Sequence, residues 1–263
     1  VTYNGEIYNF QELSRELAEL GHRFRTHCDT EVIVHAWEEW GEACVDRFRG
    51  MFAFAVWDRN HQTLFLARDR LGIKPLYYSL LPDGTLLFGS ELKSLKAHPG
   101  LPRQIDPTAV EEYFAFGYVP EPKSIYQEVY KLPPGYCMRV RRGEVQLKPE
   151  PYWDVSFQPN PHQSEADAGT ELIQRLQDAV RIRMISEVPL GAFLSGGVDS
   201  SAVVAAMAGV SDAPVNTCSI SFGDPAFNES QYAAMVADRY QTSHRVEQVD
   251  PDDFSLIDRL ADL

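Results

Sequence analysis

Apolar residues recur at helical spacing over residues 9–20, where they would share one face of a helix. Asn9 can cap the start of this helix, and Gly21 can end it. The helical period returns over residues 30–48. The chain then becomes rich in β-branched, aromatic and aliphatic residues in short runs between polar turns, at residues 51–58, 63–69, 75–81 and 85–90. Because the connections are short, the sequence predicts antiparallel strands.

Residues 140–153 are typical of one more hairpin, with Gly143 in its turn. Residues 154–166 are rich in Pro, Gln, Ser and Asn, and a segment with so little to bury is predicted to be a linker. We therefore place a first domain at 1–153 and a second domain at 167–263.

The second domain alternates helices and strands. The pattern predicts helices at 166–185, 200–208, 229–240 and 254–263, and strands at 188–194, 215–222 and 244–249. Strands that alternate with helices favour a parallel, doubly wound α/β sheet.

Composition and charge narrow the possible partners. The 263 residues carry a net charge of −14, which argues against nucleic acid or an anionic membrane surface as a partner. No apolar run approaches the roughly 20 residues that cross a bilayer. The first ten residues have no basic region followed by an apolar core, so we expect them not to be a signal peptide. The four cysteines form no close pairs, so we expect a reducing cytoplasm. The first residue is not Met and the last predicted helix has no stop signal, so we expect truncation at both ends.

The stretch "LSGGVDSS" at residues 194–201 turns from strand to helix. Gly196 and Gly197 would let the backbone approach a ligand, and the helix N-terminus favours an anion. Ser195, Ser200 and Ser201 add hydroxyl donors. The loop lacks the lysine of a P-loop, and its Asp199 would repel a phosphate unless a divalent cation bridged the two. The same residues could also form an ordinary Gly-Gly turn that binds no ligand, with Asp199 or Ser200 as the helix cap.

This stretch resembles the pyrophosphate loop of the ATP-pyrophosphatase family, whose members cleave ATP to AMP and pyrophosphate. The resemblance implies that Leu194 and Ile220 border the adenosine. It also implies that Asp199 holds Mg²⁺, and that residues 195–201 bind the phosphates of ATP.

The first domain carries "YNGEIYN" at 3–9, "CDTE" at 28–31, "GMFAFAVWD" at 50–58 and "RDRLGIKPLYY" at 68–78. Asn4, Gly5 and Glu6 would lie at a strand end before a helix, although Asn-Gly alone is also a common turn. The four stretches in this order resemble the class II glutamine amidotransferase domain. That family consists of N-terminal nucleophile hydrolases with an α+β sandwich of antiparallel sheets between helices.

Residue roles follow from this resemblance. Asn4 and Gly5 match the oxyanion hole, and Glu6 and Asp29 match residues that bind the α-amino group of glutamine. The nucleophile is a cysteine at the mature N-terminus, which none of the four cysteines here supplies. An interior thiol such as Cys28 lacks the free amine as base, so we expect it to be a half-buried structural residue.

The two domains in this order resemble glutamine-dependent asparagine synthetase. The implied reaction joins ammonia from glutamine to a carboxylate acceptor, aspartate, which Mg-ATP activates; a homodimer is compatible with the resemblance. Two alternatives stay open. One is an asparagine-synthetase-like amidotransferase of exopolysaccharide or exosortase gene clusters with another acceptor, and the other is a non-catalytic relative.

Overall fold

The computed structural model describes residues 1–263 except 145, 161, 187, 225, 227 and 250–263. The chain forms two compact units, Val1–Gln158 and Pro159–Leu263. The helix expected at 254–263 lies outside the described residues. None of the described helices is both long and apolar enough to cross a membrane.

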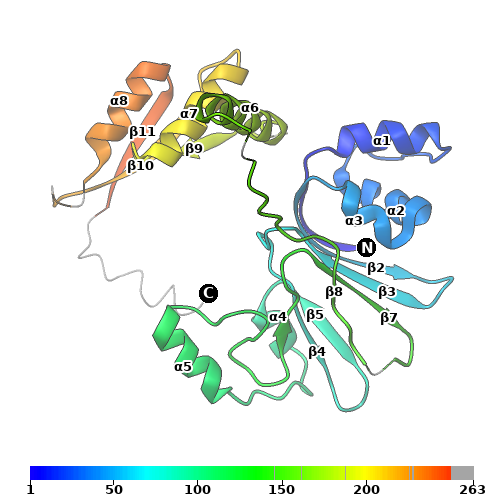
Figure 1. Cartoon of the computed structure of the whole chain (residues 1–263). Helices are drawn as coiled ribbons and strands as arrows, with labels where there is room; N and C mark the ends of the chain where they lie inside the picture. Colours follow the sequence, from blue (N-terminus) through cyan, green and yellow to red (C-terminus); the bar gives the residue numbers. More distant parts are fainter. Residues whose placement is uncertain (145, 161, 187, 225, 227, 250–263) are drawn as a thin grey trace. The chain divides into compact units, whose positions relative to one another are not determined.

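The first unit contains two antiparallel sheets (Figure 1). Their strands follow the order β1-β2-β3-β7-β8 in the larger sheet and β5-β4-β6 in the smaller one. The strands are β1 (Thr2–Ile7), β2 (Gly50–Asp58), β3 (Thr63–Arg68), β4 (Tyr77–Leu80), β5 (Leu86–Gly89), β6 (Tyr130–Lys131), β7 (Tyr136–Arg141) and β8 (Glu150–Pro151). The antiparallel strands expected from the short β-rich runs are confirmed, and so is the hairpin of β7 and β8.

Helices complete this unit. They are α1 (Phe10–Glu19), α2 (Asp29–Trp40), the 3₁₀ turn η1 (Gly41–Ala43), α3 (Cys44–Arg47), α4 (Leu92–Lys96) and α5 (Pro107–Phe116). The first two helices confirm the periodic segments of the sequence. α5 was not expected, although Asp106 caps its start and Gly117 ends it in the left-handed conformation.

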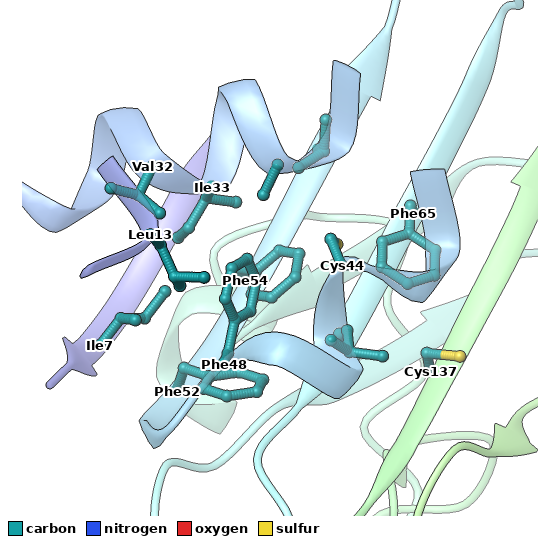
Figure 2. Packing of buried hydrophobic residues seen from close by; sticks show 14 of the residues in the cluster. Ile7, Leu13, Val32, Ile33, Cys44, Phe48, Phe52, Phe54, Phe65 and Cys137 are labelled. Carbon is teal, nitrogen blue, oxygen red and sulfur yellow. The ribbon is translucent and has the colours of Figure 1, made fainter. Parts of the chain in front are cut away.

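The alternation of side chains along β2 builds the layers of the first unit. Phe52 and Phe54 point to one face of the larger sheet, where they pack with residues of α1 and α2 (Figure 2). Ala53 and Ala55 point to the other face and pack with Tyr78 and its neighbours in the smaller sheet. A strand has a side-chain period of two, so one strand can supply both cores. α4 packs with Leu87 of β5 and with Leu81, which directly follows β4. This packing confirms antiparallel sheets between helices.

The second unit has the parallel sheet that the alternation of elements predicts (Figure 1). Its strand order is β11-β10-β9, and its elements are α6 (Glu165–Arg183), β9 (Gly191–Phe193), α7 (Val198–Val210), β10 (Asn216–Phe222), α8 (Ser230–Tyr240) and β11 (Ser243–Val249). α7 is apolar on two sides. Met207 packs toward α6, whereas Val204 packs toward α8. α7 is thus fixed between two helices, and its N-terminus is held at the carboxyl end of β9.

Candidate functional site

Asn4, Gly5 and Glu6 lie inside β1, so the expectation that they sit at a strand end is wrong. β1 pairs with β2 throughout, with Gly5 opposite Phe52. Gly5 has φ +152°, and a Cβ there would lie 2.1 Å from the Met51 carbonyl oxygen and 2.7 Å from the Phe52 Cα. The two backbones approach too closely for any other residue. Asn4-Gly5 therefore continues a strand and does not form a turn.

Asp29 is brought to β1 by α2, of which it is the first residue. Its Oδ2 accepts hydrogen bonds from the Tyr3 hydroxyl at 2.6 Å and from the Ile7 N–H at 3.0 Å. Burial, together with the hydrogen bond to Asp29, raises the pKa of Tyr3, so Tyr3 stays a donor. Burial and the charge of Asp29 raise the pKa of Glu6, an effect that Lys74 opposes. A cationic ligand near the two carboxylates would relieve their repulsion.

The Asn4 side chain reaches the second sheet. Its Nδ2 donates to the hydroxyl of Ser90 at 3.0 Å, and Ser90 directly follows β5. A side-chain amide has two N–H groups, so the second remains for an incoming oxyanion. No pattern in the sequence pointed to Ser90, because this contact depends on how the two sheets pack.

Cys28 is exposed, so the expectation of a half-buried structural cysteine is wrong. It is the N-cap of α2, a position outside the apolar face of the helix. Its Sγ lies 3.1 Å from the Thr26 hydroxyl, and this contact lowers the pKa of the thiol. Cys44 and Cys137, in contrast, are buried in the cluster that contains the core phenylalanines (Figure 2).

The segment 68–78 is organised by two buried charges. Asp69 accepts four backbone hydrogen bonds, from the N–H groups of Phe52, Leu71, Ile73 and Lys74. Arg68 forms an ion pair with Glu121 at 2.8 Å and donates to the Leu132 carbonyl at 2.7 Å. Buried charges need such partners. These residues therefore hold the loop between β3 and β4 in place. Through Asp69 the loop contacts β2, the strand that pairs with β1.

In the second unit, the chain leaves the sheet just after β9, as the sequence predicts. Leu194 is buried, and its N–H donates to the Cys218 carbonyl at 2.8 Å. Its own carbonyl accepts a hydrogen bond from the Ser219 hydroxyl. These hydrogen bonds hold the chain beside β10 as far as Leu194. The loop that contains Gly196 and Gly197 therefore starts at the carboxyl end of the sheet.

The start of α7 is not capped by a side chain. Gly197 is the N-cap, so the alternative in which Asp199 or Ser200 caps the helix is wrong. The Ser200 hydroxyl instead lies 3.1 Å from the Ser195 hydroxyl and 3.3 Å from the Ser195 nitrogen, inside the loop. Asp199 is exposed in the first turn. A helix start without a side-chain cap is suited to an external anion.

The two glycines of the loop differ in their surroundings. Gly196 has φ +84°, and a Cβ there would lie 2.4 Å from the Cβ of Tyr232 and 2.7 Å from the nitrogen of Ala233. Gly196 thus allows the loop to contact α8, which corrects the expectation that both glycines face a ligand. At Gly197, a Cβ would meet only the Ser195 hydroxyl, at 3.4 Å. Gly197 is therefore the glycine that leaves space for an approaching ligand.

A cavity of about 360 Å³ opens beside this loop. Four predicted residues line it: Leu194, Ser195, Ser200 and Ile220. Residues that the sequence did not single out complete the lining: Phe193, Cys218, Ser219, Phe222, Glu229 and Ser230. Within the described chain, Gly196, Gly197, Asp199 and Ser201 are not part of this lining, and the buried Ser201 hydroxyl has no hydrogen-bond partner. The volume and the mixture of apolar walls and hydroxyls are those of a small-molecule site.

One signal could have identified three of the missed residues, Phe222, Glu229 and Ser230. β10 ends at Phe222, and α8 begins at Ser230. Ligands of parallel sheets bind at the carboxyl ends of neighbouring strands, so the connection after β10 belongs to the same site as the loop after β9.

Known proteins resemble both units. Residues 1–153 match the family of the glutamine amidotransferase domain, and residues 171–262 match the asparagine synthase family. Asparagine synthetase (glutamine-hydrolyzing) 3 of Bacillus subtilis is 38% identical over 240 residues, which cover 88% of this chain and 38% of that protein. Asparagine synthetase (glutamine-hydrolyzing) 1 of the same organism is 36% identical over 256 residues, which cover 97% of this chain and 39% of that protein.

Two further similarities are weaker. Amidase chyE of Penicillium rubens is 34% identical over 209 residues, which cover 78% of this chain and 30% of that protein. A solved structure of glutamine phosphoribosylpyrophosphate amidotransferase from B. subtilis, complexed with ADP and GMP, aligns over 98% of this chain and 49% of that chain. Its identity of 14% and TM-score of 0.40 are too low to carry an argument.

The chain spans less than half the length of the two B. subtilis relatives, 38% and 39%. The amidotransferase match nevertheless covers residues 1–153 of the 263, and the synthase match covers residues 171–262. The chain therefore belongs to the glutamine-dependent asparagine synthetase family, with a glutamine amidotransferase domain followed by an asparagine synthase domain.

Proposed function

We propose that the protein is an ATP-dependent ligase that forms L-asparagine from L-aspartate, with glutamine as the nitrogen donor. The other products are L-glutamate, AMP and pyrophosphate. The observation that carries this proposal is the cavity at the carboxyl ends of β9 and β10, beside a helix start without a side-chain cap. Its place supports nucleotide binding, because phosphate groups favour helix N-termini.

In the first unit, glutamine binds along β1. Glu6 and Asp29 accept hydrogen bonds from its ammonium group. Burial and the charge of Asp29 raise the pKa of Glu6, and the positive charge of the ammonium group offsets both effects. The Asn4 amide and the Gly5 N–H stabilise the oxyanion that forms when a thiolate attacks the side-chain amide. Loss of one such donor typically costs about 3 to 4 kcal/mol. The attacking thiolate is that of the N-terminal cysteine implied by the family, and Cys28 has no part in this step.

In the second unit, the nucleotide base and sugar contact Leu194 and Ile220. The hydroxyls of Ser195 and Ser200 and the first turn of α7 face the phosphates. Exposed carboxylate and hydroxyl oxygens are the donors that Mg²⁺ prefers, so Asp199 would hold the ion, which supplies positive charge against the phosphates. The position of Asp199 in the first turn of α7 supports this role.

Replacement of Asp199 tests the nucleotide site. In the full-length protein, Asp199→Asn should lower pyrophosphate release at least about 100-fold, because a bridging cation contributes several kcal/mol. Glutamate release from glutamine should not change. Asp212→Asn is the matched control, since Asp212 is also exposed but lies beyond the far end of α7. Normal pyrophosphate release by Asp199→Asn would refute the assignment.

Replacement of Asp29 tests the glutamine site. Asp29→Asn should raise the KM for glutamine about 10- to 100-fold, because a hydrogen bond to a charged group is worth about 1.5 to 3 kcal/mol. Tyr3→Phe is the control, since it removes one hydrogen bond to Asp29 but keeps the carboxylate. An equal rise in KM for both variants would show that Asp29 only supports β1.

The acceptor is tested separately. Full-length protein with ATP, ammonium and aspartate should yield AMP and asparagine in equal amounts. A relative of similar identity, amidase chyE, is not named an asparagine synthetase, so membership of the family does not fix the acceptor. The second candidate is therefore an amidotransferase that acts on another carboxylate, including one of exopolysaccharide metabolism. Pyrophosphate release with another carboxylate, but none with aspartate, would support that candidate. No release with any carboxylate would indicate a non-catalytic relative.

A further inference from the structure

Two histidines and a glutamate converge beside α2, and none of them belongs to either site described above. His22 follows α1, whereas His35 and Glu38 lie one turn apart on α2. The Nδ1 atoms of the two histidines are 3.2 Å apart. Glu38 Oε2 lies 2.8 Å from Nδ1 of His35 and 3.5 Å from Nδ1 of His22. These three atoms thus form a small triangle.

The contacts of the other ring nitrogens differ between the two histidines. Nε2 of His22 lies 3.0 Å from a carboxylate oxygen of Glu39, a hydrogen-bond distance that favours a proton on Nε2 and a lone pair on Nδ1. Nε2 of His35 lies 3.6 Å from Glu31, so the hydrogen bond of this ring is the one between Nδ1 and Glu38. A metal ion would take the place of the proton between His35 and Glu38, with both Nδ1 atoms and the carboxylate oxygen as its ligands.

The size of the triangle suits a metal ion. Bonds of about 2.0 to 2.1 Å to zinc in tetrahedral geometry place ligand atoms about 3.3 Å apart. The three observed distances of 2.8, 3.2 and 3.5 Å bracket this value. Carboxylates that accept from the outer nitrogen of a metal-bound histidine are the usual support of such sites, and Glu39 occupies this position beside His22.

We propose that His22, His35 and Glu38 bind a divalent transition-metal ion of the zinc class. The side chains of both histidines are 16% exposed, whereas that of Glu38 is 54% exposed, so a fourth, solvent-derived ligand can reach the ion from the Glu38 side. Two nitrogens and one carboxylate oxygen are a common zinc donor set. Mg²⁺ and Ca²⁺ prefer oxygen donors and should bind much more weakly.

The ion would fasten the connection between α1 and α2. Glu31 already accepts hydrogen bonds from the N–H groups of Arg25 at 2.8 Å and Thr26 at 2.7 Å, which fold this connection onto the start of α2. His22 is the one ligand of the three that lies on the connection and not on the helix. The metal thus adds a second attachment, and it orders the segment that leads into Asp29.

The test is a titration of untagged, metal-stripped full-length protein with Co²⁺ and then Zn²⁺. Co²⁺ should give the visible absorption bands of a tetrahedral site, saturating at one ion per chain, and Zn²⁺ should displace it. Glu38→Gln, at an exposed position, should weaken Co²⁺ binding at least 10-fold without loss of folding. His22→Ala should abolish the bands, and Glu39→Gln should weaken binding about 10- to 100-fold.

His27→Ala is the matched control, because His27 lies in the same connection but is exposed and outside the triangle. It should leave the Co²⁺ spectrum and affinity unchanged. Circular dichroism of each metal-free variant shows whether it is folded. Absence of saturable Co²⁺ binding in the parent protein would overturn the proposal, and so would bands that survive both His22→Ala and Glu38→Gln.

Discussion

Replacement of Gly5 by alanine should separate β1 from β2 although it removes no side chain from the core. Two effects act at this position. The backbone has φ +152°, and a Cβ would lie 2.1 Å from the Met51 carbonyl oxygen, which belongs to the backbone of the neighbouring strand and cannot rotate away. The strands must therefore move apart at the centre of a ladder that runs from the pair of Thr2 and Ala55 to the pair of Ile7 and Gly50.

Two other glycines separate these effects. Gly143 has φ +85° with nothing near its Cβ position, so Gly143→Ala should cost only the conformational strain of about 1 to 2 kcal/mol. Gly50 has no such φ, but its Cβ would lie 2.1 Å from the Glu6 carbonyl oxygen, so Gly50→Ala should cost about 1 to 3 kcal/mol of overpacking. Gly5→Ala carries both effects, and the free energy of unfolding should fall by about 2 to 5 kcal/mol.

Urea unfolding, followed by tryptophan fluorescence, measures these changes in the free energy of unfolding directly. The four tryptophans of the chain, Trp37, Trp40, Trp57 and Trp153, all lie in the first unit, so the signal reports that unit. The expected order of destabilisation places Gly5→Ala first and Gly143→Ala last. A Gly5→Ala midpoint equal to that of Gly143→Ala would refute the close approach of β1 and β2.

Two further predictions use the same unit. Asp69→Asn should lower the free energy of unfolding by at least about 3 kcal/mol in the same urea assay, because both carboxylate oxygens of Asp69 accept buried backbone N–H groups; a change below about 1 kcal/mol would contradict this role. At pH 8 the exposed Cys28, with its lowered pKa, should react with a disulfide reagent in a fast phase that Cys28→Ser removes. Burial raises the pKa of Cys44 to about 12 and of Cys137 to about 11, so both stay protonated and should react only after unfolding. Cys218 is partly exposed, so a native phase that survives in the double variant Cys28→Ser, Cys218→Ser would count against this.

The long periodic segments of the fold could be predicted, and the short or exposed ones could not. α1, α2 and β2 bury a regular set of apolar residues, and that regularity is visible in the sequence. β6 is two residues long, too short to show any period. β8 is equally short, and only the turn signal at Gly143 indicated it, as part of a hairpin. α5 exposes its apolar residues, so periodicity did not mark it, and only its end signals, Asp106 with Pro107 and Gly117, could have done so.

In the candidate sites, too, some contacts could be predicted from the sequence and others could not. Contacts within one motif, such as Ser195 with Ser200, span a few residues and could be expected from the loop alone. The bond between Asn4 and Ser90 spans 86 residues, and it exists because two sheets pack against each other. How the elements pack depends on all of their apolar faces together, so a short segment of the sequence cannot predict such a contact.

The glycines show why a motif is an incomplete guide to a site. Gly5 and Gly196 both stand in strings that resemble ligand-binding motifs, yet a Cβ at either would first collide with the protein itself, at the backbone of β2 and at α8. Gly197 is different, since its Cβ would meet little besides a neighbouring hydroxyl. Within one short motif, some residues are thus required by the fold, and others remain available for binding. A site of this kind is defined by residues such as Gly197 whose identity the fold leaves open, and only the structure separates them from residues that the fold demands.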